Sequence, residues 1–215
     1  KESFEREAQV LASLEHPCIV PVYDFGYVEA GPYLVMRLML GGSLEDQLKD
    51  AGQMPLVDVA RIAERVALGL DHIHSKNIVH RDLKPANLLR DENGDLFLAD
   101  FGLVKLVGQS GGLSAKFILG TPAYMSPEQM SGDSEIDGRT DVYALGVIVY
   151  ELLAAKLPFW DSDTTRLMMK HLLDPVPSIS QQRPDLPPAI DAILLRALAK
   201  SPNDRYKTAG DLADA

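Results

Sequence analysis

Apolar residues recur at helical spacing over most of the chain and at strand spacing over only a few short runs. The longest helical pattern covers residues 56–75, where apolar positions return every three or four residues. The helix from Asp141 is apolar nearly all round, which predicts burial on every side. This helix is predicted to cover residues 140–154, and further helices are predicted over residues 3–14, 164–173, 188–200 and 208–215. The chain is therefore expected to be mainly helical.

Strand patterns are confined to four short runs that pair as hairpins, residues 18–27 with 33–36 and residues 87–90 with 96–99. Gly31-Pro32 is expected to turn the first hairpin, and Asn93-Gly94 the second. Between the hairpins Gly41-Gly42 breaks the chain, and Ser43 with Asp46 three residues later predicts the start of a helix. The strands thus form a minor part of the predicted fold.

Composition narrows the possible classes of protein. The 215 residues, 46% of them hydrophobic, are enough for one sizeable core, or for one large and one vestigial lobe. The formal net charge of -10 argues against non-specific nucleic-acid binding, which uses a basic face. A single cysteine, Cys18, excludes an internal disulfide. The most apolar run, residues 142–150, is too short to cross a bilayer, so no membrane contact is expected from this segment.

Residues 78–89 and 99–102 carry the candidate chemistry, as Ile-Val-His-Arg-Asp-Leu-Lys-Pro-Ala-Asn-Leu-Leu and Ala-Asp-Phe-Gly. They supply Asp82, Asn87 and Asp100, whose side-chain oxygens can accept a proton and hold metal-bound phosphates. An isolated Asp before Leu-Lys-Pro is usually a turn or helix cap, and an isolated Asp-Phe-Gly is weak evidence. The joint spacing is far more specific, because several offsets match at once. It resembles the catalytic-loop and Asp-Phe-Gly signatures of protein kinases, and the resemblance runs along the whole chain.

The resemblance implies an α+β, protein kinase-like fold made mainly of the helical large lobe (C-lobe). Residues 1–36 would be a remnant of the small lobe (N-lobe), with a helix that bridges the lobes and two strands. Residues 37–215 would form the hinge and the large lobe. Neither a glycine-rich phosphate loop nor the strand lysine of an intact kinase is found in the sequence, and either one, if the gene encodes it, would lie upstream. The 215 residues alone are therefore expected to be poorly active.

The resemblance also implies the catalytic roles. Asp82 would accept the proton of the attacking hydroxyl, and Lys84 would neutralise charge on the transferred phosphoryl group. Asn87 and Asp100 would hold Mg²⁺, and ATP would be the phosphoryl donor.

Nucleotide-binding residues follow from the same resemblance. Met36 would be the gatekeeper before the hinge, while Arg37 and Met39 would lend backbone groups to the adenine. Leu89 would pack beneath the base. Glu7 would be the glutamate of the bridging helix that pairs with the strand lysine.

The catalytic loop and the segment after the Asp-Phe-Gly motif together indicate the substrate class. Lys84 and a threonine at Thr121 resemble serine/threonine kinases rather than tyrosine kinases. Ser126-Pro127-Glu128 resembles the motif that closes the activation segment, and in the family its glutamate pairs with a distal arginine, here Arg205. Asp141 is expected to be a helix cap and, as the resemblance implies, an acceptor for the catalytic-loop backbone, two roles that are compatible.

Regulation by phosphorylation is a further hypothesis. Arg81 and Lys105 would form a basic pair that faces the activation segment and captures a phosphate. Ser114 is the best candidate for the phosphorylated residue, with Ser110 and Thr121 as alternatives.

The predicted function is transfer of the ATP γ-phosphate to a Ser or Thr hydroxyl of a protein. A pseudokinase-like binding scaffold without catalysis is the alternative, and a small-molecule phosphotransferase is disfavoured by the Ser-Pro-Glu segment. Residues 119–129 resemble the eukaryotic-like serine/threonine kinases of bacteria. The expected partners are ATP, a protein substrate and a second copy for autophosphorylation. The expected location is the cytoplasm, either free or as the cytosolic domain of a membrane-tethered kinase.

Overall fold

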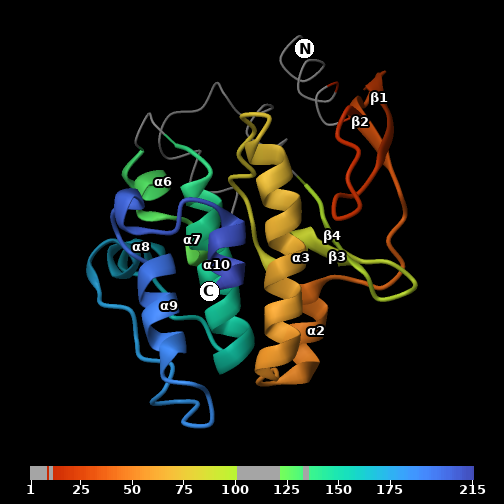
Figure 1. The fold of residues 1–215 in the computed structure, drawn as a ribbon. Coiled ribbons are helices and arrows are strands. Elements are labelled where there is room, and N and C mark those ends of the chain that lie inside the picture. Colours follow the sequence, from red (N-terminus) through yellow and green to blue (C-terminus); the bar gives the residue numbers. More distant parts are fainter. Residues whose placement is uncertain (1–8, 10–11, 101–121, 133–135) are drawn as a thin grey trace.

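The computed structural model describes residues 9, 12–100, 122–132 and 136–215, in which two hairpins accompany a larger helical assembly (Figure 1). In chain order the described elements, with η for a 3-10 helix, are β1 (Val22–Val28), β2 (Gly31–Met36), α2 (Leu44–Ala51), α3 (Leu56–His74), η1 (Pro85–Asn87), β3 (Leu88–Arg90), β4 (Leu96–Leu98), η2 (Pro122–Tyr124), α6 (Pro127–Ser131), α7 (Arg139–Ala154), α8 (Thr164–Leu173), α9 (Ala189–Ala197), η3 (Pro202–Asp204) and α10 (Ala209–Asp214).

The core lies where α3 meets α7 and α10 (Figure 1). The inner face of α3 buries apolar residues at helical spacing, among them Val59, Val66 and Leu70. α7 is buried nearly all round, as the sequence predicts. Each large aliphatic side chain buried in this way contributes about 1.5–3 kcal/mol. Gly146 lets α9 approach α7 closely, because a Cβ there would lie 2.9 Å from that of Ala197.

Both predicted hairpins are present. β1 pairs antiparallel with β2, and β3 pairs antiparallel with β4. The Asn93-Gly94 turn lies where it was predicted, between β3 and β4, and Gly94 has a φ of 83°. The predicted helices over residues 56–75, 140–154 and 164–173 agree with α3, α7 and α8. Of the predicted helix over residues 3–14, only the helical Gln9 and Ala12 and the stretch after them are described.

The first hairpin departs from the prediction in two places. Its turn is Glu29-Ala30, because Val28 pairs with Gly31 and Pro32 already belongs to β2. Gly31 opens that strand with a φ of 130°, a conformation open to glycine. The first strand begins at Val22 rather than at residue 18, since Pro21 lacks the N–H that a continuous ladder needs.

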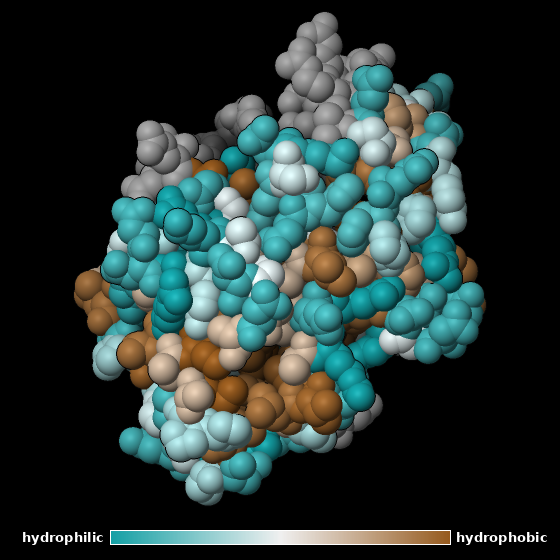
Figure 2. All heavy atoms as spheres, viewed as in Figure 1, coloured by the Kyte–Doolittle hydropathy of each residue, from teal (hydrophilic) through white to brown (hydrophobic). Residues whose placement is uncertain are grey.

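The visible surface is mainly hydrophilic (Figure 2). Figure 2 shows hydrophilic side chains over most of one face, with apolar side chains gathered around the lower ends of α7 and α9. Among the described residues, no helix is both long enough and apolar enough to span a membrane.

Candidate active site

The loop between α3 and β3 brings together Asp82, Lys84 and Asn87. Lys84 Nζ donates to Asp82 Oδ2 at 2.8 Å, and Asn87 Nδ2 donates to the same oxygen at 3.2 Å. Asn87 Nδ2 also donates to the carbonyl of Asp82 at 2.8 Å. Asp82 Oδ1 accepts no hydrogen bond from a described residue.

His80 belongs to this loop and links it to the residues just after β4. Burial lowers the pKa of the imidazole, so the ring is neutral at physiological pH. Its Nδ1 accepts the backbone N–H of Asp82 at 3.3 Å, which leaves the proton on Nε2 to be donated to the carbonyl of Ala99 at 3.0 Å. The imidazole thereby fixes Asp82 relative to the residue that precedes Asp100.

Asp141 fastens the loop to α7. Its carboxylate accepts the backbone N–H of His80 at 2.8 Å and that of Arg81 at 2.9 Å, and His74 Nε2 lies 2.7 Å from it. The helix begins with Gly138 as its N-cap, and Asp141 is the third residue of α7. The acceptor role implied by the kinase resemblance is therefore the one present, and the plain cap is not.

Asp100 lies next to the catalytic loop at the end of β4. The preceding residue, Ala99, donates its N–H to the carbonyl of Asn87 at 2.9 Å. Asp100 is exposed and has a φ of 54°, which is unusual for a non-glycine residue. No described residue hydrogen-bonds its carboxylate. The described residues contain no group of three His, Cys, Asp or Glu side chains that could bind a metal by themselves.

The predicted hinge follows β2 and contacts one residue next to a strand of each hairpin. Arg37 donates its backbone N–H to the carbonyl of Pro21 at 3.0 Å, and its guanidinium lies 3.1 Å from Asp91 Oδ2. Its carbonyl and the backbone of Met39 carry no hydrogen bond to a described residue. Met36, Met39 and Leu89 pack around one small apolar cluster, formed by Val20, Phe97 and Ala99.

Glu128 and Arg205 form the buried ion pair that the kinase resemblance implies. The contact is bidentate, with both N–O distances 2.7 Å, and the two side chains are 6% and 0% exposed. The remaining Arg205 donors reach the carbonyls of Arg139, Ala199 and Lys200, while Thr140 Oγ1 donates to Glu128 Oε1 at 2.7 Å. Burial alone would raise the pKa of Glu128, but the bonds from Arg205 hold it below its ordinary value.

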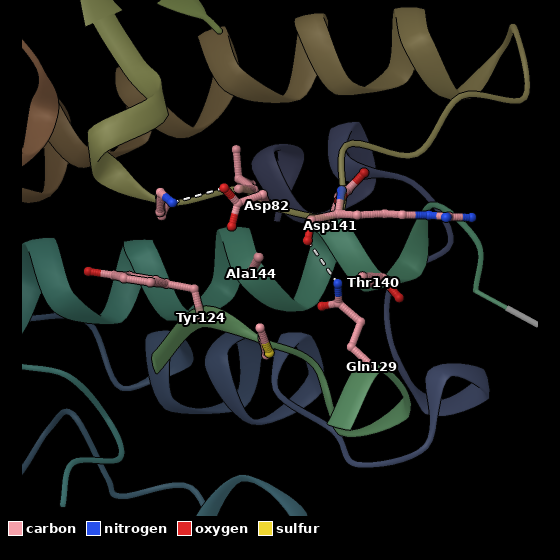
Figure 3. Close-up of a pocket in the computed structure, with 10 residues that line it drawn as sticks. Asp82, Tyr124, Gln129, Thr140, Asp141 and Ala144 are labelled. Carbon is pink, nitrogen blue, oxygen red and sulfur yellow. Dashed lines mark hydrogen bonds and ion pairs between the residues drawn. The ribbon is translucent and has the colours of Figure 1, made fainter. Parts of the chain in front are cut away.

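A small pocket opens beside Asp82 (Figure 3). It is lined by the catalytic loop, by Tyr124 and Gln129, and by the start of α7. Tyr124 Oη donates to Glu151 Oε2 at 2.6 Å, and Gln129 Nε2 donates to the carbonyl of Arg81 at 2.8 Å. The first bond attaches the segment after residue 121 to α7, and the second attaches it to the catalytic loop.

Several predicted residues lie outside the described part of the chain: Glu7, Lys105, Ser114 and Thr121. Their roles stay predictions, and so does phosphate capture by Arg81. The Arg81 residue is exposed, and its backbone bonds to Asp141 and Gln129. Sequence reasoning did not single out Gln129 or the Arg37 guanidinium. A signal existed for Gln129, because it stands three residues after Ser126 as in a capping box.

Comparison with known proteins identifies the family. A family model described as protein kinase domain matches residues 1–213. Serine/threonine-protein kinase PknL of Mycobacterium tuberculosis is 41% identical over 206 residues, which cover 96% of this chain and 51% of the relative. Serine/threonine-protein kinase PknH of Mycobacterium bovis is 36% identical over 213 residues, which cover 99% of this chain and 36% of the relative. The chain thus spans about a third to a half of the length of these relatives.

The fold agrees with this relationship. The crystal structure of Rad53 1-466 in complex with AMP-PNP superposes with a TM-score of 0.82 at 27% identity, covering 100% of this chain and 54% of that one. The expected α+β, kinase-like fold is confirmed. The likeness to the eukaryotic-like serine/threonine kinases of bacteria is confirmed by the relatives. The chain belongs to the protein kinase domain family.

Proposed function

We propose that this chain carries out phosphoryl transfer in a serine/threonine protein kinase, from ATP to a Ser or Thr hydroxyl of a protein. One observation carries the proposal: Lys84 Nζ and Asn87 Nδ2 converge on a single oxygen of Asp82, while its Oδ1 accepts no hydrogen bond from a described residue and Asp82 lines a pocket. Phosphoryl transfer depends on alignment and charge neutralisation, and a catalytic loop built in this way supplies both.

In this proposal Asp82 Oδ1 accepts the proton of the attacking hydroxyl. The hydroxyl oxygen forms its bond to the γ-phosphorus as the bond to the β–γ bridging oxygen breaks, and ADP leaves. Lys84 stays within reach of the phosphoryl oxygens because its flexible stem lets a compact cation follow them. The hydrogen bond from Asn87 to the carbonyl of Asp82 keeps the loop from rotating as the proton moves.

ATP and Mg²⁺ are the proposed cofactors. The Asn87 amide oxygen and the Asp100 carboxylate are hard oxygen ligands, and neither accepts a hydrogen bond from a described residue. When bound through them, Mg²⁺ would neutralise the phosphate charge. Since Mg²⁺ takes few protein carboxylates, the absence of a larger acidic cluster among the described residues fits this ion. The Arg37 carbonyl and the Met39 backbone, which carry no hydrogen bond to a described residue, would receive the adenine edge, above Leu89.

The proposal also covers the lobe boundary, the cellular location and a second copy of the protein as substrate. We place the boundary between small-lobe and large-lobe residues at Met36–Arg37, and the domain in the cytoplasm, where ATP and Mg²⁺ are abundant. A second copy of the protein would serve as an early substrate for autophosphorylation.

The test is phosphate transfer by the full-length protein from radiolabelled ATP with Mg²⁺. Casein serves as the protein acceptor, kanamycin as the small-molecule acceptor, and phosphoamino-acid analysis identifies the product. We expect phosphoserine or phosphothreonine, lost in Asp100→Asn and retained in Asp185→Asn, which changes an exposed carboxylate paired with Arg183. Nucleotide binding without transfer, or transfer to kanamycin alone, would contradict the proposal.

A further inference from the structure

Gln129 uses the two ends of its side-chain amide for different purposes. Its Oε1 accepts the backbone N–H of Ser126 at 3.1 Å, and Ser126 Oγ accepts the backbone N–H of Gln129 at 3.4 Å. This reciprocal pair is a capping box that starts α6. The Nε2 end takes no part in the cap. It donates instead to the backbone carbonyl of Arg81 at 2.8 Å, as the dashed line from Gln129 in Figure 3 shows.

Two other helices show what the cap itself requires. In the described part of the chain, α2 and α10 also begin with capping boxes, and Asp46 and Asp211 stand where α6 has Gln129. A carboxylate is sufficient there because the cap needs only an acceptor. An amide adds a donor that the cap does not use. At α6 that donor meets the catalytic loop, 48 residues away in the sequence.

The bond acts on the peptide unit that carries Asp82. The carbonyl of Arg81 and the N–H of Asp82 belong to the same peptide plane. Gln129 holds the carbonyl, while His80 Nδ1 holds the N–H at 3.3 Å. Arg81 has a φ of 65°, a conformation that persists in a non-glycine residue only where its surroundings impose it. Bonds at both edges of the plane therefore determine the direction in which Asp82 leaves the backbone.

We propose that Gln129 is a positioning residue for phosphoryl transfer: its amide Nε2 fixes the Arg81–Asp82 peptide and so aims the Asp82 carboxylate. This links the residue that follows the Ser-Pro-Glu motif, through the Arg81 carbonyl, to the peptide that carries the catalytic carboxylate. The inference rests on the proposed kinase activity. Gln129 acts through Asp82, and the adenine would contact the hinge, so the expected effect is on kcat and not on the KM for ATP.

Two substitutions in the full-length protein separate positioning from capping. Gln129→Glu keeps an acceptor for Ser126 but removes the donor to Arg81, whereas Gln129→Met removes both. Asp211→Ala is the matched control, because it removes the corresponding capping-box side chain from α10. We expect both Gln129 variants to lose about 10- to 100-fold in kcat, the scale on which misplaced catalytic groups cost rate. The KM for ATP should stay within about twofold, and Asp211→Ala should keep the wild-type kcat.

Hydrogen exchange supplies a readout that does not require activity. Deuterium uptake of a peptide covering residues 78–84 should be faster in Gln129→Glu than in wild type, and unchanged in Asp211→Ala. Wild-type kcat in Gln129→Glu, or a loss confined to Gln129→Met, would overturn the proposal in favour of a capping role. If the wild-type protein transfers no phosphate, the proposed function fails by itself. The exchange result then decides the positioning role, and unchanged uptake in Gln129→Glu overturns it.

Discussion

Two carboxylate–cation pairs have almost equal N–O distances but differ in how far their side chains are exposed to solvent. Arg205 meets Glu128 at 2.7 Å, with side chains 0% and 6% exposed. Lys84 meets Asp82 at 2.8 Å, with side chains 24% and 32% exposed. The buried pair is bidentate and has further bonds to Thr140 and to backbone carbonyls. The partly exposed pair has a single N–O contact, and the other oxygen of Asp82 accepts no hydrogen bond from a described residue.

The comparison shows how burial changes the behaviour of a carboxylate–cation contact. A buried pair must satisfy every donor and acceptor, because water cannot replace a missing partner. It therefore holds one geometry, which suits the anchoring of α6 to the end of the chain. A half-exposed pair exchanges partners at little cost. That property suits a carboxylate that must receive a proton and a cation that must move toward a phosphate.

The largest expected effect comes from removing the catalytic carboxylate. Asp82→Asn should lower kcat by about 10²- to 10⁴-fold, the usual contribution of a general base. Its free energy of unfolding should change by less than about 1 kcal/mol, because the pair with Lys84 is partly exposed. Steady-state kinetics and urea unfolding of the same preparation measure both quantities. Equal losses of activity and stability would show that Asp82 serves the fold.

Breaking the buried pair should have the opposite profile. Glu128→Gln leaves Arg205 as an uncompensated buried charge, which costs about 3–5 kcal/mol of unfolding free energy. Asp137→Asn is the matched control, since it breaks the more exposed pair with Arg139 and should cost at most about 1 kcal/mol. Urea unfolding monitored by circular dichroism measures the two changes. Similar costs for the two variants would contradict the contrast drawn from burial.

A third test lowers the pH, so that His171 takes up a proton and a positive charge is added to a buried region. Burial, with a smaller effect of the Lys200 charge, lowers the pKa of His171 to about 4 from 6.5. The unfolded state then binds more protons than the folded state between these values, so stability falls as the pH drops through that window. The shift corresponds to about 3 kcal/mol between pH 7 and pH 4. Urea unfolding at both pH values should show this loss in the wild-type protein.

The neighbours of His171 determine how that loss is assigned. Its Nδ1 lies 2.8 Å from Tyr143 Oη, and the Tyr143 ring lies 4.8 Å from the Arg205 guanidinium. Lys200 Nζ donates to the carbonyl of His171 at 2.6 Å, and no described residue bonds to His171 Nε2. His171→Gln keeps a partner for Tyr143 and removes the titrating group. It should flatten the pH dependence, and an unchanged slope would assign the effect to other groups.

The sequence predicted the parts of the fold that local rules determine. Helical spacing located α3 and α7, and Asn93-Gly94 located the second hairpin. The turn of the first hairpin was placed two residues too late, because Gly31-Pro32 satisfies the rules for a turn and also those for the start of an edge strand. Only the pairing of Val28 with Gly31 distinguishes the two.

The site divides in the same way. Asp82, Lys84 and Asn87 stand within six residues of one another, so a motif captures their convergence. The Glu128–Arg205 pair spans 77 residues and was reached only through family resemblance. The bonds from Arg37 to Asp91 and from Gln129 to Arg81 span 54 and 48 residues. They depend on how the loops meet in space, which no local pattern records.

The smallest expected effect on stability completes the comparison. Lys84→Met keeps the length of the stem and removes the charge that lies 2.8 Å from Asp82 Oδ2. Because both partners are partly exposed, the free energy of unfolding should change by less than about 1 kcal/mol. Turnover should nevertheless fall about tenfold or more, since the charge on the transferred phosphoryl group loses its neutralising cation. Urea unfolding and steady-state kinetics measure the two effects, with Lys156→Met, a change at an exposed lysine, as the control. A stability loss close to that of Glu128→Gln would contradict the comparison. It would mean that the contact between Lys84 and Asp82 stabilises the fold as much as the buried pair does, despite its greater exposure.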